Sequence, residues 1–213
     1  MRMEPFVSVA GPAAAIMRNN IDTDQITPGH TGMKVQKSGF GDGLFFNWRY
    51  LEDGSNNPDF ILNQPPFTEA KFLLAGPNFG CGSSREFAVW ALRDFGVRAV
   101  IAASFGAIFT SNCFMNGVAP IILDETEVNA ITAEISPASP EITVDMAAQN
   151  VISPSGRIFP FQLPALQRER LLEGLDAIDF TLRREPDIKS FQVADGARRP
   201  WVYKITSSRE IVA

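Results

Sequence analysis

The sequence predicts an α/β domain whose central sheet contains parallel strands. It holds three continuous apolar runs, at residues 72–75, 99–103 and 119–123. Such runs are typical of strands that are buried on both faces. Two segments with helical periodicity separate them, from Phe87 to Phe95 and from Phe105 to about Cys113, and Ser104 is predicted to cap the second. Because strands that alternate with helices pair in parallel, this order predicts a βαβαβ unit.

The elements before this unit are shorter. Between residues 5 and 18 an apolar run is interrupted at Gly11-Pro12 and continues as an alanine-rich stretch, which predicts a strand pair at the edge of a sheet. The polar turn that follows contains Asp22 and Asp24. These carboxylates could act as acids, bases or metal ligands, although a role in forming the turn is the favoured interpretation.

The segment from Thr27 to Gly43 is rich in glycine and shows no regular period. Long irregular segments in compact domains are usually functional or disordered, so we predict a mobile lid over about residues 27–43. The next stretch, from Leu44 to Tyr50, is dense in aromatic residues. Such a cluster could stack on a ring-shaped ligand, but packing in a core or an interface is the favoured interpretation.

Regular elements are also predicted after the βαβαβ unit. Asp124 and Glu127 form a capping-box pattern for a helix that reaches Glu134. Pro164 opens a charged helix that ends at Gly174. Three short strands between these helices form a hairpin region, at residues 142–144, 150–152 and 157–161.

The tail from about residue 183 to residue 213 is polar enough to be an extension. Its apolar residues Trp201, Val202 and Tyr203 could add an edge strand or a dimer contact.

A glycine-rich loop at residues 76–86, GPNFGCGSSRE, joins the first strand of the unit to its helix; we call it the glycine loop. Gly80 and Gly82 can adopt backbone angles that other residues avoid, and they leave room for a ligand to approach the main chain. In parallel sheets, ligands bind beyond the carboxyl ends of the strands, which is where this loop lies. We therefore predict the binding site here, with the lid nearby.

The end of the glycine loop has the features of an anion site. Ser83 or Ser84 is predicted to be the N-cap, so that the first amides of the helix and its dipole point into the loop. Arg85 adds a forked cation suited to a carboxylate or a phosphate. A glycine turn with a serine cap can also have a purely structural role. The loop matches neither the Walker pattern nor the dinucleotide fingerprint.

Composition argues against several classes of function. The 213 residues carry a net charge of -5 and no basic run, whereas nucleic-acid binding needs clustered Lys and Arg. No segment has the apolar length of a membrane span, and the first residues lack the pattern of a signal peptide. We therefore expect a soluble cytoplasmic protein with no nucleic-acid or membrane partner.

Two cysteines, Cys81 and Cys113, are too few for a disulfide framework and fit a reducing compartment. Cys81 could be a nucleophile activated by the helix N-terminus. Its one candidate base is His30, the single histidine of the chain, so a catalytic Cys81 is the less favoured interpretation.

The glycine loop also carries a family resemblance. Its run Asn78-Phe79-Gly80-Cys81-Gly82-Ser83-Ser84-Arg85-Glu86 resembles the signature of the aconitase superfamily swivelling domain, and in particular the small subunits of bacterial 3-isopropylmalate dehydratase. Further matches occur in order along the chain, at residues 20–26, 39–41, 44–45, 48–49 and 174–178. The resemblance covers roughly residues 5–190. It implies a single three-layer β/β/α swivelling domain over residues 1–213.

The resemblance implies a reaction and the residues that carry it. The enzyme family isomerises 2-isopropylmalate to 3-isopropylmalate in leucine biosynthesis by removing and restoring water. The implied roles are Ser83 as the base that takes a proton from carbon and Arg85 as the clamp for a substrate carboxylate. Ser84, Gly82 and Met33 complete the implied substrate-binding site.

Family members use a 4Fe-4S cluster as Lewis acid, held by three cysteine thiolates. The two cysteines of this chain cannot hold it, and neither has a cluster-binding spacing, so no metal ligand is predicted here. The resemblance therefore implies a partner large subunit that carries the cluster. The substrate, a small-molecule diacid, would bind at the interface.

Two departures from the family pattern leave the exact diacid open. Thr31 and Gly32 stand where the family typically has an aromatic residue followed by leucine, and Phe87 stands where many small subunits have histidine. Met33 and Phe87 are both apolar, which favours an alkyl-bearing substrate. Two alternatives remain: the small subunit of a related hydro-lyase for another diacid of the substituted maleate type, and a non-catalytic carboxylate-binding module.

Overall fold

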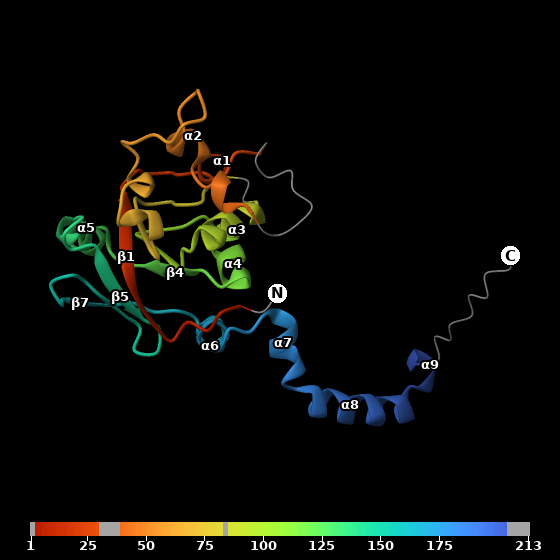
Figure 1. Ribbon diagram of the computed structural model, residues 1–213. Coiled ribbons are helices and arrows are strands. Elements are labelled where there is room, and N and C mark those ends of the chain that lie inside the picture. The colour runs from red at the N-terminus through yellow and green to blue at the C-terminus, as the bar shows by residue number, and fades with distance from the viewer. Residues whose placement is uncertain (1–2, 30–38, 83–84, 204–213) are drawn as a thin grey trace, which may run out of the picture. The chain divides into compact units, whose positions relative to one another are not determined.

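A computed structural model describes residues 3–29, 39–82 and 85–203 of the chain (Figure 1). The chain forms two compact units, Met1–Asp176 and Ala177–Ala213. The first unit contains a seven-stranded mixed sheet with the strand order β4-β3-β2-β1-β5-β6-β7. Among the residues described, no helix is long and apolar enough to cross a lipid bilayer.

The parallel half of the sheet confirms the predicted βαβαβ unit. Its elements are β2 (Phe72–Ala75), α3 (Glu86–Phe95), β3 (Ala99–Ala102), α4 (Ala107–Asn116) and β4 (Ala119–Ile122). The pairs β2 with β3 and β3 with β4 are both parallel. Each helix ends at a glycine in the left-handed conformation, Gly96 with φ 111° and Gly117 with φ 77°, because such a residue lets the chain leave the helix without strain.

β1 (Ser8–Ile16) is one central strand, so the prediction of a strand pair at a sheet edge is wrong. Its first half pairs antiparallel with β5 (Glu141–Asp145), and its second half pairs parallel with β2. β1 changes its partner strand at Pro12. Pro12 has no N–H to donate, and its carbonyl accepts a hydrogen bond from Lys71 N at 2.8 Å. The Gly11-Pro12 signal therefore marks a change of pairing partner and not a reversal of the chain.

The antiparallel half agrees with the predicted hairpin region. α5 (Glu125–Glu134) begins at the predicted capping box. β6 (Asn150–Ile152) and β7 (Ile158–Pro160) then follow β5 as antiparallel neighbours. α6 (Ala165–Glu173) ends at the predicted glycine.

Short elements connect β1 to β2. They are α1 (Thr23–Ile26), η2 (Gly41–Gly43), α2 (Phe46–Arg49), η3 (Ile61–Asn63) and η4 (Phe67–Glu69). The aromatic cluster around α2 belongs to the core, as predicted, because Phe45 is fully buried and stacks on Trp48 with ring centroids 5.4 Å apart. Most of the predicted lid, residues 30–38, lies outside the described residues.

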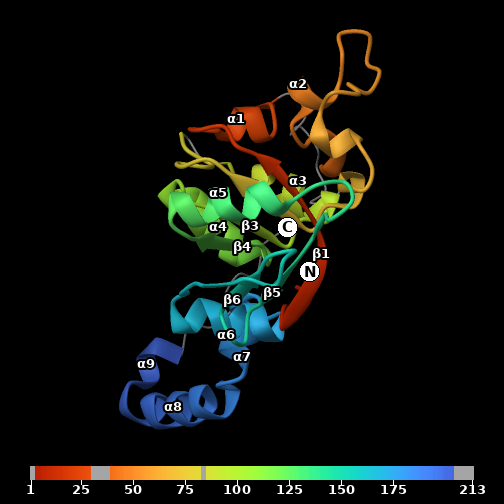
Figure 2. The same ribbon diagram turned by 90° about the vertical axis from the view of Figure 1, so that its left-hand side faces the viewer.

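Two apolar cores divide the first unit into three layers, as the β/β/α prediction requires. On one face of the parallel strands, Leu73 and Val100 pack with the inner residues of α3 and α4. On the other face, Leu74 and Ile101 pack with β5, β6, β7 and α5. Figure 1 shows these layers from left to right as α5 with β5 and β7, the parallel strands, and α3 with α4. Figure 2 shows α1 and α2 at one end of this unit and α6 at the other.

The second unit consists of α7 (Ala177–Leu182), α8 (Glu185–Arg198) and α9 (Pro200–Tyr203). The predicted edge strand at residues 201–203 is wrong, because these residues are helical. Asp195 accepts hydrogen bonds from Arg199 Nε at 2.7 Å and from Tyr203 Oη at 3.0 Å. These partners follow it by one and two helical turns, so the side-chain network favours helix over strand.

Candidate active site

Three loops that follow the parallel strands β1, β2 and β3 meet at one edge of the sheet. The glycine loop, after β2, lies between the other two, and backbone hydrogen bonds hold it on both sides. On one side Gly80 N donates to Ile21 O at 2.7 Å. On the other side Phe79 N donates to Ser104 O at 3.1 Å, and Gly106 N donates to Phe79 O at 2.9 Å. These bonds extend the parallel pairing beyond the strand ends and fix the first part of the loop.

Gly80 and Gly82 have similar backbone angles but different surroundings. Gly80 has φ 71°, and a Cβ at this position would overlap the ring of Phe109 in α4. Gly82 has φ 84°, and among the described residues a Cβ there would meet only Asp22 Cβ, at 3.8 Å. Both glycines therefore have the predicted left-handed conformation, and packing against Phe109 requires a glycine at position 80. No described residue blocks the main chain at Gly82.

The helix after the loop starts later than predicted. α3 begins at Glu86 with Arg85 as its N-cap, and the Arg85 side chain makes no capping hydrogen bond. Because Arg85 has an extended backbone, with φ -102° and ψ 132°, the chain turns into the helix only after both serines. The prediction that Ser83 or Ser84 is the N-cap is therefore wrong. Ser83, Ser84 and Met33 themselves lie outside the described residues.

The predicted cap of α4 is wrong for a different reason. The N-cap of α4 is Gly106, two residues after the expected Ser104. The Ser104 hydroxyl instead accepts a hydrogen bond from Asn78 N at 2.8 Å, and Asn78 Nδ2 donates to Asn20 Oδ1 at 2.8 Å. Ser104 thus holds the glycine loop by a hydrogen bond to Asn78. A capping pattern does not predict this long-range contact.

Arg85 forms an ion pair with Asp24 of α1 across the site. α1 is held by the reciprocal bonds of a capping box, from Gln25 N to Asp22 Oδ1 at 2.7 Å and from Asp22 N to Gln25 Oε1 at 2.9 Å. Asp22 therefore has the turn role that the sequence predicts. Asp24 instead has a partner 61 residues away, which no local pattern could indicate.

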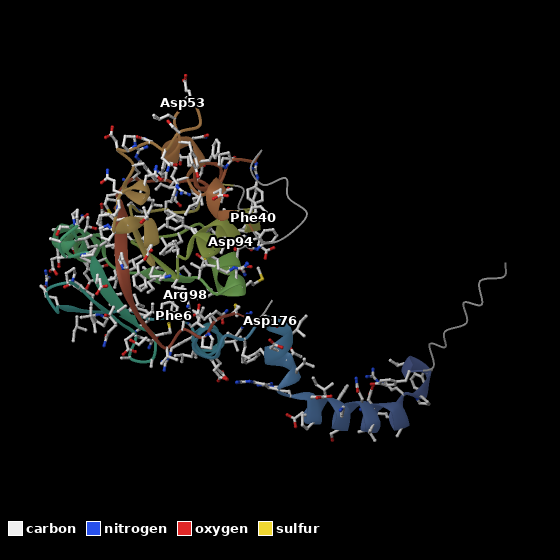
Figure 3. The ribbon with its side chains drawn as sticks, in the orientation of Figure 1. Phe6, Phe40, Asp53, Asp94, Arg98 and Asp176 are labelled. Carbon is white, nitrogen blue, oxygen red and sulfur yellow. The ribbon has the colours of Figure 1, made fainter. Side chains whose placement is uncertain are left out.

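The guanidinium of Arg85 is partly exposed and lies near an aromatic ring. The Arg85 side chain is 40% exposed and that of Asp24 is 60% exposed. Arg85 Cζ is 5.7 Å from the ring centroid of Phe87, whose ring faces that of Phe40 at 6.4 Å. Figure 3 shows Phe40 beside Asp94, whose carboxylate accepts a hydrogen bond from Phe40 N at 3.0 Å. Phe87 therefore contributes an apolar wall next to the cation.

This arrangement suits the binding of a carboxylate. Arg85 offers a planar fork of donors, and the positive end of the α3 dipole lies beside it. Its pair with Asp24 is solvent-exposed, and such pairs contribute only about 0–1 kcal/mol. An incoming carboxylate can therefore replace Asp24 at small cost.

Comparisons with known proteins agree with this geometry. The family model of the aconitase C-terminal domain matches residues 3–126. The chain is 49% identical over 205 residues to the 3-isopropylmalate dehydratase small subunit of Cupriavidus necator, covering 94% of this chain and 99% of that protein. It is 46% identical over 200 residues to the corresponding subunit of Rhizobium meliloti, covering 93% and 100%. The crystal structure of 3-isopropylmalate dehydratase from Methanocaldococcus jannaschii matches with a TM-score of 0.66 at 26% identity, covering 86% of this chain and 99% of that chain.

The chain belongs to the family of 3-isopropylmalate dehydratase small subunits. The resemblance predicted from the glycine loop is confirmed, and so is the aconitase-superfamily fold. The matched residues 3–126 include Asp24, the glycine loop and Arg85. The designation as small subunits also implies a large-subunit partner.

The residues of this chain do not fit an iron–sulfur cluster. Cys81 is half-buried in the glycine loop, whereas Cys113 is fully buried in α4, where desolvation raises the pKa of its thiol well above the ordinary value. A cluster of the 4Fe-4S type needs more thiolates than these two. In the described ranges, no three His, Cys, Asp or Glu side chains are grouped so that they could hold a metal ion.

A cavity of about 350 Å³ lies at the opposite edge of the parallel strands. Its lining includes Lys71, Arg98 and Gly117, which come just before β2, β3 and β4. It is therefore separate from the site that the glycine loop and Arg85 form at the carboxyl ends.

Proposed function

We propose that this chain is the small subunit of a 3-isopropylmalate dehydratase, a hydro-lyase that converts 2-isopropylmalate into 3-isopropylmalate in leucine biosynthesis. The observation that carries the proposal is the exposed guanidinium of Arg85 at the start of α3, presented by a glycine loop that is hydrogen-bonded on both sides. The near full-length identity to small subunits of that enzyme supports the same reaction.

The first task of this chain is to bind one carboxylate of the substrate. Arg85 and the first amides of α3 hold it, and the open main chain at Gly82 lets it approach. When a proton leaves the carbon next to this carboxylate, negative charge develops on the carboxylate oxygens. Arg85 then stabilises the transition state more than the ground state, which is the condition for catalysis.

The second task is the proton transfer, which we assign to Ser83. A serine hydroxyl is not ionised at neutral pH unless positive charge and oriented amides stabilise the alkoxide. Arg85, two residues after Ser83 in the sequence, supplies the positive charge, and the N-terminus of α3 supplies the oriented amides. Ser84 then donates a hydrogen bond to the substrate or orients Ser83, and Met33 contacts the substrate's alkyl group.

The third task, helping the hydroxyl to leave, falls to the large subunit. We expect that subunit to hold a 4Fe-4S cluster as Lewis acid, because this chain does not have the thiolates for one. The complex would act in the cytoplasm on a small-molecule diacid bound between the subunits. The isolated chain should therefore be inactive.

A second candidate is the small subunit of a related hydro-lyase for another small diacid, of the substituted maleate type. The observation that favours it is Phe87, which places an aromatic wall 5.7 Å from Arg85 where many small subunits have histidine. A change of this kind beside the carboxylate clamp would alter which diacid fits.

The test is coexpression with the large subunit of the same genome under anaerobic conditions. Isomerisation of 2-isopropylmalate and hydration of dimethylcitraconate are measured for the wild type, for Ser83→Ala and for Ser190→Ala, an exposed serine of α8. We expect Ser83→Ala to lower kcat by about 10²–10⁴ with the complex intact, and Ser190→Ala to leave it unchanged.

Other outcomes would redirect the proposal. Full activity in Ser83→Ala would remove that serine as the base. An intact complex that is inactive on isopropylmalate but hydrates a substituted maleate would favour the second candidate. Failure to form any complex would favour a non-catalytic carboxylate-binding module.

A further inference from the structure

The outer side of α4 carries no charge. Ala107, Ile108, Ser111 and Met115 are exposed on it, Ile108 by 59% and Met115 by 45%. The spacing from 108 to 111 to 115 places these residues along one side of the helix, and we call them the outer face of α4. None of the ten residues of α4 is Asp, Glu, Lys, Arg or His.

The other helices of similar or greater length differ in this respect. α3, α5, α6 and α8 each contain at least three charged residues. Charged and polar residues normally cover the solvent side of a surface helix, whereas the centre of a protein interface is depleted of charge and enriched in methionine. The outer face of α4 thus has the composition of an interface.

The outer face of α4 begins at the candidate active site. Gly106, the N-cap of α4, donates a hydrogen bond to Phe79 of the glycine loop at 2.9 Å. A Cβ at Gly106 would overlap the carbonyl of Gly80, so the start of the helix packs directly on the loop. Ile108 follows in the first turn. A protein that covers the glycine loop would therefore adjoin Ile108.

We propose that the outer face of α4 docks the large subunit. The inference rests on the proposed function, because a partner that supplies the missing Lewis acid must reach the glycine loop. A standard interface buries about 800 Å² on each partner, which is more than a helix about 15 Å long can provide. The outer face of α4 and residues 76–82 of the glycine loop together form the contact surface.

The test uses the double variant Ile108→Glu/Met115→Lys. A glutamate in the first turn and a lysine in the last turn have the signs that the helix dipole favours, so α4 should still fold. The matched control is Ile158→Glu, which changes an isoleucine that is 62% exposed on β7, in another layer of the unit. Calorimetry measures the Kd of each purified chain for the large subunit of the same genome, and circular dichroism verifies the fold.

We expect the double variant to bind the large subunit at least about tenfold more weakly than the wild type, and the control to bind within about twofold. Activity of the double variant should return when the large subunit is raised above the new Kd, whereas that of Ser83→Ala should not.

An unchanged Kd in the double variant would overturn the inference and leave the proposed function standing. A wild-type dimer that the double variant converts to a monomer would show that a second copy of this chain covers the face, and the inference would be wrong. A wild-type chain that does not bind the large subunit at all would overturn both the inference and the proposed function.

Discussion

The two edges of the parallel strands each carry an arginine, and the two are held very differently. Arg98, at the amino edge, is only 12% exposed and pairs with Glu4 Oε2 at 2.6 Å. It also donates to the carbonyl oxygens of Glu4 and Pro5 at 3.1 and 3.0 Å, and its Cζ lies 5.0 Å from the ring centroid of Phe6. Figure 3 shows Arg98 and Phe6 close together in the part of the first unit toward α6.

Arg85, at the carboxyl edge, is 40% exposed and pairs with Asp24, which is 60% exposed. Its contact with the Phe87 ring is longer, at 5.7 Å. A largely buried cation that donates to two main-chain carbonyls joins chain segments, whereas a more exposed cation whose partner is a side chain can exchange that partner for a ligand. We therefore expect the amino edge to contribute to stability and the carboxyl edge to function.

Of the variants that test this comparison, Arg85→Lys should have the largest effect. Lysine keeps the charge but loses the planar fork, so we expect kcat/KM of the complex to fall by about 10²-fold or more. The free energy of unfolding should change by less than about 1 kcal/mol, because the pair with Asp24 is exposed. Steady-state kinetics and urea unfolding measure the two quantities.

The control is Arg157→Lys, which changes another exposed arginine in an ion pair. A loss of stability comparable to the loss of activity would mean that Arg85 is structural.

The opposite pattern, a loss of stability without a loss of activity, is expected from Arg98→Ala. Removing a largely buried guanidinium with two main-chain hydrogen bonds and an ion pair should lower the free energy of unfolding by about 2–3 kcal/mol. The kcat of the folded complex should stay the same, since Arg98 lies at the other edge of the sheet. Urea unfolding of the isolated chain and kinetics of the complex measure this. A fall in kcat with unchanged stability would contradict the division between the two edges.

Most of the first unit could be predicted because its signals are local. The apolar runs of β2, β3 and β4, the glycines that end α3 and α4, and the capping box of α5 each lie within a few neighbouring residues. The error at β1 arose because Gly11-Pro12 is also a turn signal. Only the partner strands on either side show that the chain continues straight through Pro12.

The candidate site could be located from the sequence, but its contacts could not. The glycine loop and Arg85 lie where the strand–loop–helix pattern predicts. The Arg85–Asp24 pair and the bond from Asn78 N to the Ser104 hydroxyl join residues 61 and 26 positions apart. Periodicity and capping patterns span only a few residues, so they predict neither contact. The predicted cap at Ser104 failed because its hydroxyl accepts a long-range hydrogen bond from Asn78 N.

A smaller effect is expected from Asp24→Asn, which tests whether Asp24 competes with the substrate. Without the carboxylate, Arg85 should bind the substrate without first giving up a partner, so KM should fall by about two- to fivefold at unchanged kcat. Steady-state kinetics of the complex measure both constants, with Asp59→Asn, in an exposed turn, as the control. A higher KM together with a lower kcat would show instead that Asp24 orients Arg85 for the reaction.

The smallest effect is expected away from both edges, at Glu134 in the last turn of α5. Hydrogen bonds from Ser153, the largest contribution, and from Ser155 and Arg157 lower the pKa of Glu134 to about 2. A carboxyl group whose pKa is lowered by folding stabilises the protein fully above its ordinary pKa of 4.5, and this stabilisation is lost as the pH falls toward 2. Glu134→Gln should therefore lower Tm by about 1–3 °C at pH 6 and by less at pH 3. Calorimetry at both pH values, with Glu125→Gln as the control in the same helix, measures the difference. An equal decrease at the two pH values would show that the charge of Glu134 does not contribute.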